Sequence, residues 1–416
     1  YNQSSPTGHL NGKIDEVRIY SDVLTTTEAG YIYNNTTASI PTDNLTAYYK
    51  LNGDARDEQQ LYDGTASNVT YAYDGTASNV TYQEATKFQP DLVWIKARDN
   101  GSNNHLLTDS IRGVGVTSSV LSSNLTGVSN FNFGHISSFN SNGFTVAAGS
   151  SSANYVNSSV ANYVAWCFNA GTSAAATNND GSIASTVKAN QDAGFSIAKW
   201  TGNGSTNIET IGHGLSQTPE MIIWKNIDRS QNWHVYNSYG SGTSDWGYLN
   251  LTDAFGSANN PATMMNQTAP TSTVFTIYNN AGNANTANYN GEDYIAYCFH
   301  SVDGYQKIGT YDGTGASGNT VETGFEPAFV MIKKTSGTGS WYMFDNKRLT
   351  LPYSDQLIAD SSGAESVGTY VKFLANGFQL DTTASDLNTG SQTFIYLAIA
   401  ADPDTTTPTV ENSFDV

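Results

Sequence analysis

The sequence is poor in charge, in cysteine and in long apolar runs. Only 13% of its 416 residues are charged, and 18 Lys and Arg stand against 37 Asp and Glu, for a net charge of −19. The basic residues are scattered, whereas a nucleic-acid surface needs them clustered. No run approaches the roughly 18 apolar residues of a membrane helix, and two cysteines do not make a disulfide scaffold. We therefore expect neither nucleic acid nor a membrane among the partners.

The residues that are present follow the pattern of strands. Short runs rich in Val, Ile, Tyr, Phe and Trp alternate with Gly, Asn, Asp and Ser turns, at intervals of roughly 8 to 15 residues. An apolar stripe of helical period is nearly absent, and the best helical candidate begins near Thr25, where Thr and Glu have the spacing of a capping box. The pattern predicts an all-β protein of tandem sandwich or jelly-roll modules with one or two short helices.

A diverged repeat runs through most of the chain. Three strands begin with proline, PDLVWIK from Pro90, PEMIIWK from Pro219 and PAFVMIK from Pro327. A second strand follows each of them, and each copy closes on an aromatic strand 73, 75 or 69 residues after its proline. The second strands lie around His105, Trp233 and Trp341, and the closing strands are YVAWCF from Tyr163, YIAYCF from Tyr294 and YLAIAA from Tyr396. The order and the spacing predict three homologous β modules.

These landmarks set the predicted domain boundaries. The modules cover residues 86–180, 181–302 and 303–405, with the segment 169–192 as the joint between the first two. Residues 406–416 are predicted to be a linker and the start of a further module, because SFDV from Ser413 is similar to GFSI at the opening of module 2. A shorter duplication, YDGTASNVTY at Tyr62 and again at Tyr73, lies before the first module.

Two N-terminal segments resemble laminin-G-like domains of the concanavalin type. GKIDEVRIYSDVLTTTEAGYIYNN from Gly12 resembles the closing strand and helix of such a domain, and LTAYYKLNGDARDEQQLYDGTASNVTY from Leu45 resembles the opening of another. The resemblance implies that residues 1–41 end one domain and that residues 42–85 begin a second, truncated one. We expect residues 1–40 to pack against polypeptide supplied from elsewhere, because an orphaned strand exposes unpaired backbone groups.

From Phe88 onward the chain resembles a module of unknown function found in virion and tail proteins of phages, especially marine ones. The resemblance rests on FQPDLVWIKARDN, DAGFSIAKWTGNG, TIGHGLSQTPEMIIWKN, YIAYCFHSVDGYQKIGTYDGTG and GFEPAFVMIKK. It implies a structural or adhesive part at the virion surface, such as a tail fibre, spike or capsid appendage. The implied partners are other virion proteins, further copies of the chain and host surface polysaccharide. A bacterial extracellular adhesin or filament subunit is the alternative, followed by a glycan depolymerase.

Motifs for chemistry are weak. Gly313–Gly318 fits G-x-G-x-x-G but lies between two strand patterns, which favours a hairpin turn over a cofactor loop. The six histidines never reach metal-ligand spacing, and most acids lie in turns rather than as a facing pair. Asp54 and Asp57 remain open as calcium ligands. We expect no catalytic residue, no cofactor and no metal site.

Tryptophan offers the one candidate ligand contact. Trp246 lies in the polar stretch GTSDWGY, where an exposed indole would stack on a sugar ring. Trp94, Trp166 and Trp224 lie within apolar strands and are predicted to be core. We therefore name Trp246 as the glycan-binding candidate.

Two kinds of repeated position are predicted to be structural. Asp109 with Arg112, and Asp345 with Arg348, recur at matching places and suggest an ion pair at a strand end. Cys167 and Cys298 both take the fifth position of a closing strand, where module 3 is predicted to carry Ala400. A place that accepts Cys, Cys and Ala is typical of a small buried site, so we expect two thiols without a disulfide.

Overall fold

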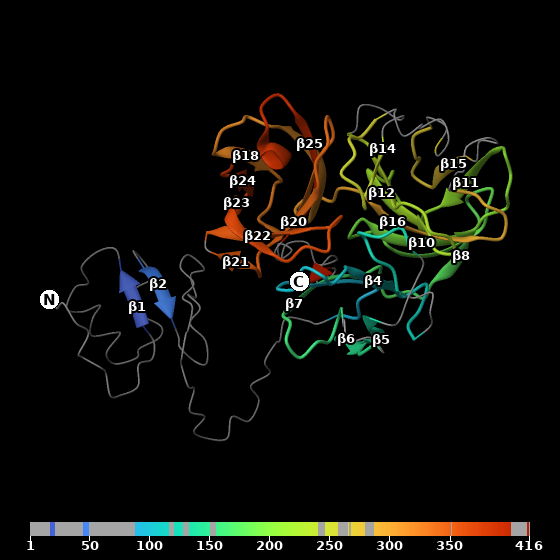
Figure 1. The fold of residues 1–416 in the computed structure, drawn as a ribbon, viewed down its shortest axis with the longest axis horizontal. Helices are drawn as coiled ribbons and strands as arrows, with labels where there is room; N and C mark the ends of the chain where they lie inside the picture. Colours follow the sequence, from blue (N-terminus) through green and yellow to red (C-terminus); the bar gives the residue numbers. More distant parts are fainter. Residues whose placement is uncertain are drawn as a thin grey trace, which may run out of the picture. The chain divides into compact units, whose positions relative to one another are not determined.

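A computed structural model describes most of the three repeats and three short strands outside them (Figure 1). The described residues are 88–115, 120–127, 133–149, 155–239, 246–256, 265, 268–278, 287–350 and 352–400, with β1 (Val17–Tyr20), β2 (Leu45–Tyr49) and β26 (Phe414–Asp415). Nearly all regular structure is antiparallel strand, and a single four-residue helix is described, α2 (Ser385–Asn388). The predicted all-β class is confirmed. The helix candidate near Thr25 lies outside the described residues.

The chain divides into two compact units, residues 1–82 and 83–416. In the first unit, β1 pairs antiparallel with β2, with Val17 opposite Tyr49. β1 lies in the segment that resembles the end of one laminin-G-like domain, and β2 lies in the segment that resembles the start of another. The described partner strand of β1 therefore belongs to the same chain. The duplication at 62–82 and the pair Asp54 and Asp57 lie outside the described residues.

The three modules of the second unit share one order of four strands. In each, the second strand, the proline-led strand, the closing strand and an opening strand lie side by side. In module 1 these are β4 (Leu106–Asp109), β3 (Leu92–Ala97), β7 (Tyr163–Phe168) and β26. In module 2 they are β13 (His234–Asn237), β12 (Met221–Asn226), β16 (Asp293–Phe299) and β10 (Phe195–Thr201). In module 3 they are β20 (Trp341–Asp345), β19 (Pro327–Lys334), β25 (Thr393–Ala400) and β17 (Gln306–Asp312).

The strand register confirms that the three prolines are equivalent. The third residue after each proline faces the same place on its closing strand, in the pairs Val93–Cys167, Ile222–Cys298 and Val330–Ala398. In module 3, the residues that match the closing strands of modules 1 and 2 therefore lie two positions earlier in the chain than the sequence repeat suggested. Phe394, and not Tyr396, is the equivalent of Tyr163 and Tyr294. Ala398, and not Ala400, stands at the cysteine position.

Further strands widen modules 2 and 3. The segment predicted to be a joint holds β8 (Ala176–Asn178) and β9 (Ser185–Asn190), which extend the sheet of module 2 beyond β10. At the other edge of that sheet lies β14 (Trp246–Tyr248). Module 3 continues from β20 through β22 (Tyr353–Ile358), β23 (Ser366–Leu374), β24 (Gly377–Leu380) and β18 (Asn319–Glu322), and β21 (Leu349–Thr350) pairs with β22. Residues 169–192 are therefore part of a sheet rather than only a connection.

A short second layer accompanies the first two sheets. It is the hairpin β5 (His135–Asn140) and β6 (Gly143–Ala147) in module 1, and the pair β11 (Ile208–Gly212) and β15 (Val274–Tyr278) in module 2. The stretch FNSNGF, residues 139–144, forms the turn of the hairpin in module 1, with Asn140 opposite Gly143. Gly143 has φ of 142°, a conformation that suits glycine alone.

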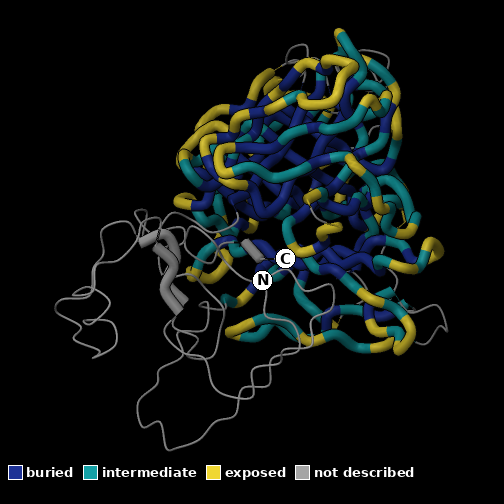
Figure 2. Tube along the Cα trace, turned by 90° about the vertical axis from the view of Figure 1, so that its left-hand side faces the viewer, coloured by how far each residue is buried: buried dark blue, intermediate teal, exposed yellow. Residues whose placement is uncertain are grey.

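Buried residues, dark blue in Figure 2, gather in the interior of the second unit, and their apolar side chains form clusters. Trp94, Trp166 and Trp224 are 5%, 0% and 1% exposed, so their predicted core role is confirmed. One cluster of buried residues runs through all three modules and includes Trp166, Phe299 and Phe329. The modules therefore share a core, as domains on flexible linkers would not.

Candidate functional site

The contacts between modules repeat around a closed cycle. In module 3 the buried Lys333 stands opposite Trp341 in the ladder. In each module a ring at or just before the start of the second strand donates to a backbone carbonyl of a neighbouring module. The three pairs are Trp233 Nε1 with Ser122 O at 2.8 Å, Trp341 Nε1 with Tyr248 O at 2.8 Å, and His105 Nε2 with Ile358 O at 3.0 Å. Module 2 thus donates to module 1, module 3 to module 2, and module 1 to module 3.

His105 replaces tryptophan in this cycle as a neutral ring. Its Nδ1 accepts a hydrogen bond from Trp94 Nε1 at 2.8 Å, so Nε2 carries the proton that faces Ile358 O. Burial lowers the pKa of His105 to about 3. The imidazole is therefore an uncharged donor, equivalent in geometry to the two indoles.

The predicted Asp–Arg pairs exist, and each also binds an aromatic ring of another module. Asp109 Oδ2 lies 2.5 Å from Arg112 Nε and accepts a hydrogen bond from Tyr297 of module 2 at 2.9 Å. Both charged side chains are fully buried. Burial, and then the neighbouring carboxylate of Asp109, raise the pKa of Tyr297 well above its usual value. The hydroxyl therefore remains a proton donor and closes the site.

The second pair repeats this arrangement between modules 3 and 1. Asp345 Oδ2 lies 2.6 Å from Arg348 Nε and 3.1 Å from Trp166 Nε1 of module 1. Trp166 and Tyr297 occupy equivalent places in their closing strands, as the register shows. The predicted ion pairs at the strand ends are confirmed, but their aromatic partners could not be anticipated from local sequence.

The surroundings of Arg348 differ from those of Arg112. Arg348 Nη1 also contacts Glu365 at 2.7 Å, and Glu365 takes a two-pronged contact from Arg98 of module 1. A planar guanidinium matches both oxygens of a carboxylate, which fixes orientation as well as distance. Modules 1 and 3 are thereby joined by charge in addition to packing.

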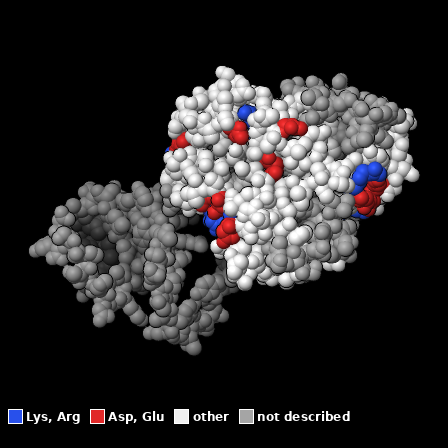
Figure 3. Space-filling model, in the orientation of Figure 1, with Lys and Arg blue, Asp and Glu red and all other residues white. Residues whose placement is uncertain are grey.

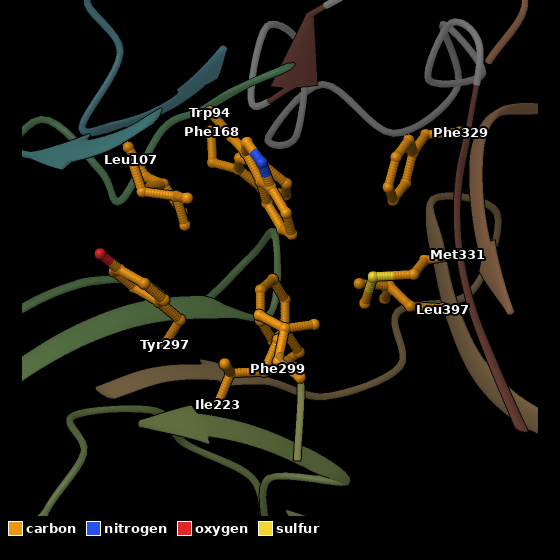
Figure 4. A pocket seen from close by; sticks show the side chains of 11 residues that line it. Trp94, Leu107, Phe168, Ile223, Tyr297, Phe299, Phe329, Met331 and Leu397 are labelled. Carbon is orange, nitrogen blue, oxygen red and sulfur yellow. The ribbon is translucent and has the colours of Figure 1, made fainter. Parts of the chain in front are cut away.

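A small cavity lies where the three modules meet (Figure 4). Its volume is about 20 Å³ and its lining is almost wholly apolar. The labelled side chains come from all three modules and point to a common centre, among them Trp94, Phe168, Ile223, Phe299, Phe329 and Met331. Pockets for small molecules are usually roughly 300 Å³ or more, and an apolar void of this size stays dry. This cavity is a packing gap and offers no room for a substrate.

Three lysines are buried at equivalent places, a repetition that the sequence displayed but that no motif explained. Lys96, Lys225 and Lys333 are fully buried, and burial lowers the pKa of each to about 8. Each ammonium donates to backbone carbonyls, as Lys225 does to Asn226 O at 2.8 Å and Arg229 O at 3.2 Å. A buried lysine of lowered pKa can be a nucleophile. Here all three ammonium groups donate to backbone carbonyls at equivalent places, so we interpret these lysines as structural.

Trp246 is not where its predicted role requires it. It begins β14, is 5% exposed and stacks on Trp224 at 5.7 Å between ring centroids. An indole that is covered by other side chains presents no face to a sugar ring. The expectation of an exposed Trp246 is wrong, because the polar residues before it do not continue into the strand that it starts.

The glycine-rich stretch Gly313–Gly318 connects β17 to β18 and opens no helix. The two strands pair with β25 and β24 and not with each other, so this is a connection between strands rather than the hairpin turn that was predicted. No group of three metal-binding side chains exists among the described residues. None of the helices in the described part has the length and apolar character to cross a membrane.

Charge is also sparse on the surface. The face drawn in Figure 3 carries a few separate charged groups within wide areas of uncharged residues. Lys199 and Asp293, 2.5 Å apart, are one described ion pair that joins strands within a module, whereas the partly exposed pair of Arg98 and Glu365 joins modules 1 and 3. Such a surface would contact partners through hydroxyl, amide and aromatic groups rather than through a field of one sign.

Comparison with known proteins adds a family without an assigned activity. A family model described as "Domain of unknown function (DUF7483)" matches residues 65–403. No curated protein and no solved structure matches the chain. The matched range spans the three modules from β3 to β25. The chain belongs to the family described as Domain of unknown function (DUF7483).

Proposed function

We propose that the chain is a structural and adhesive component of a phage virion, such as a tail fibre, spike or capsid appendage. The observation that carries the proposal is the closed cycle of contacts through Trp233, Trp341 and His105. It uses buried polar groups to fix three modules as one stiff body. Stiffness is what a spacer or spike needs.

The described ionisable clusters support a role without catalysis. Asp109 with Arg112 and Asp345 with Arg348 are buried and bound by rings of the adjacent module. Hydrolysis of a glycan requires two carboxylates that face each other across an open cleft. The buried pairs supply the opposite arrangement, a carboxylate matched to a guanidinium and closed to solvent.

Mass spectrometry of purified particles tests the proposal. Particles are banded on a density gradient from a lysate of the cells that carry the gene, and the chain is quantified relative to the major capsid protein. We expect it in the particle band at a fixed ratio. Recovery only from the cell envelope would favour the adhesin or filament alternative. Release of reducing ends from host polysaccharide by the purified chain would favour a depolymerase.

A further inference from the structure

Module 2 carries a histidine at a place where the other two modules carry different residues. The equivalent residues of the three second strands are Leu106, His234 and Tyr342, which stand opposite Ile95, Trp224 and Ile332 in their ladders. A leucine needs no hydrogen bond, and the hydroxyl of Tyr342 reaches Asp386 at 3.3 Å. Only the histidine titrates near neutral pH. A titratable ring at this place is therefore a feature of module 2.

Three aromatic rings surround His234, and we call them the cage. Trp224 of β12 stacks on the imidazole with ring centroids 5.4 Å apart. Trp246 and Tyr248 of β14 lie at 5.0 and 5.2 Å from it, measured between the same points. Trp224 and Trp246 also stack on each other, and His234 is only 3% exposed. The imidazole is thus held between two strands by ring contacts.

Three ring nitrogens of this group have no hydrogen-bond partner in the described part of the chain. They are Nδ1 of His234 and the Nε1 atoms of Trp224 and Trp246, and all three are buried. Buried polar groups almost always have a partner, and one that lacks a partner lowers stability. Module 1 avoids this cost with Ile95 and Leu106 at the two ladder positions. Module 2 thus retains polar rings in a place that an apolar pair can fill.

The closed cage accommodates a neutral imidazole but not a charged one. Burial, and then the charge of Lys225 in β12, lower the pKa of His234 well below its usual value. Tyr236 of β13 and Tyr248 of β14 remain neutral near pH 7, because burial raises the pKa of each. Attraction between an imidazolium and the indole faces would offset part of the penalty, but it supplies no acceptor for the Nδ1 proton. A protonated His234 is therefore more stable in water than in the cage.

β14 is the part of the cage that can move. It is a three-residue strand at the edge of its sheet, and its one partner among the described strands is β13. Short elements with few partners open at a low cost in free energy. In this ladder Tyr248 stands opposite His234 itself, and the carbonyl of Tyr248 is the acceptor for Trp341 Nε1 of module 3. Opening of β14 would therefore expose the histidine and break one contact of the closed cycle.

We propose that His234 is an acid-operated latch between modules 2 and 3. Protonation expels the imidazole from the cage and releases β14, and with it the Tyr248 carbonyl that Trp341 binds. The open state takes up a proton near pH 6.5, as an ordinary histidine does, and the closed state does not. The closed state therefore loses stability as the pH falls, and the ratio of open to closed molecules rises by up to tenfold per pH unit. The latch is a property of module 2 and does not depend on the proposed virion role.

Hydrogen exchange on the full chain tests the latch. Protection factors, which remove the intrinsic effect of pH on exchange, are measured at pH 7, 6 and 5 for the amides of β14 and of β16, the central strand of the same sheet. Protection of β14 should fall about threefold from pH 7 to pH 6 and about eightfold from pH 6 to pH 5, as one proton with an open-state pKa of about 6.5 requires. The indole N–H of Trp341 should lose protection together with β14, while β16 remains protected.

Two substitutions at the same position are the matched controls. His234→Leu and His234→Tyr introduce the residues that modules 1 and 3 carry at this place, so both should fold, which the circular dichroism spectrum and the unfolding midpoint at pH 7.5 check. Protection of β14 in these variants should not change between pH 7 and pH 5. A fall in a folded variant that equals the fall in the native chain would overturn the proposal, as would a native β14 that does not respond. Equal loss at β14 and β16, or a β14 that opens while Trp341 keeps its protection, would overturn it as well.

Discussion

The Asp109 site and the corresponding place in module 2 differ in charge. Asp109 has Arg112 three residues later and receives the hydroxyl of Tyr297. Module 2 has Asn237 at the aspartate position and Gly240 at the arginine position, and Leu397 of module 3 takes the place of Tyr297 in its closing strand. The acid, the base and the ring donor are thus absent together.

This joint loss shows how the contact is built. A buried aspartate without its arginine, or an arginine without its aspartate, would be a charge out of water with no partner. A fully neutral version of the contact avoids that penalty. Asn237 is nevertheless completely buried, and its Nδ2 lacks a hydrogen-bond partner. The charged contact at Asp109 and the neutral contact at Asn237 fill the same place in the fold. Packing therefore fixes this position, and either a charged or a neutral set of side chains can occupy it.

The largest expected effect comes from breaking one half of the charged version. Asp109→Asn keeps the size of the side chain but leaves Arg112 buried without an anion, which should cost about 3 to 5 kcal/mol of unfolding free energy. Urea denaturation measures the loss. Asp303→Asn, at an exposed turn, is the matched control and should have little effect. The double variant Asp109→Asn with Arg112→Met should recover part of the loss, and no recovery would contradict the interpretation.

A smaller effect is expected from the ring donors of the cycle. Trp341→Phe removes the Nε1 donor and leaves the carbonyl of Tyr248 unsatisfied, at a cost of about 1 to 3 kcal/mol beyond the lost packing. Trp224→Phe is the control, because Trp224 is equally buried but its Nε1 has no hydrogen-bond partner. If the two variants lose the same stability, the cycle of ring donors does not hold the modules together.

The lysine positions predict an unusual dependence on pH. Lys96, Lys225 and Lys333 have a folded pKa of about 8 against an ordinary value of 10.5. Between these values the unfolded chain binds more protons than the folded chain, so stability should rise with pH. Above about pH 10 the buried tyrosines oppose the rise, because burial raises their folded pKa and the unfolded chain then loses protons first.

Unfolding free energies at pH 7.5, 8.5 and 9.5 would measure the rise between about pH 8 and pH 10. Lys225→Met should remove about one third of it, since three similar groups contribute. A stability that falls steadily over this range would show that the three lysines remain charged in the folded chain. Unlike the aspartate position, the lysine position has the same chemistry in all three modules, so each variant should behave alike.

Much of this fold could be predicted from the sequence because the repeat is internal. Proline-led strands, closing strands and the Asp–Arg pairs recur at nearly constant spacing, and each recurrence limits what the residues can be doing. The closing strand of module 3 was misaligned because FIYLAIAA offers Tyr396 as a false match for Tyr163. Only the ladder with β19 shows that Phe394 is the equivalent residue.

The contacts between modules could not be predicted in this way. Tyr297 and Asp109 are 188 residues apart, and no local pattern links them. Trp246 was misjudged for a related reason, since its burial depends on Trp224 of another strand. Side chains that meet only after sheets pack leave no signal in a single sequence.

The smallest expected effect is at the cysteines. Cys298 is 0% exposed, burial raises its pKa to about 12, and Ala398 fills the same place in module 3. Cys298→Ala should therefore cost only about 1 kcal/mol, the value of one small buried group.

Cys167 is 9% exposed beside β26, so it should react with a thiol reagent faster than Cys298 in the folded chain. Neither cysteine forms a disulfide in the structure, so denaturing titration without reductant should find two thiols. Equal rates at the two sites would show that the two thiols are equally accessible in the folded chain.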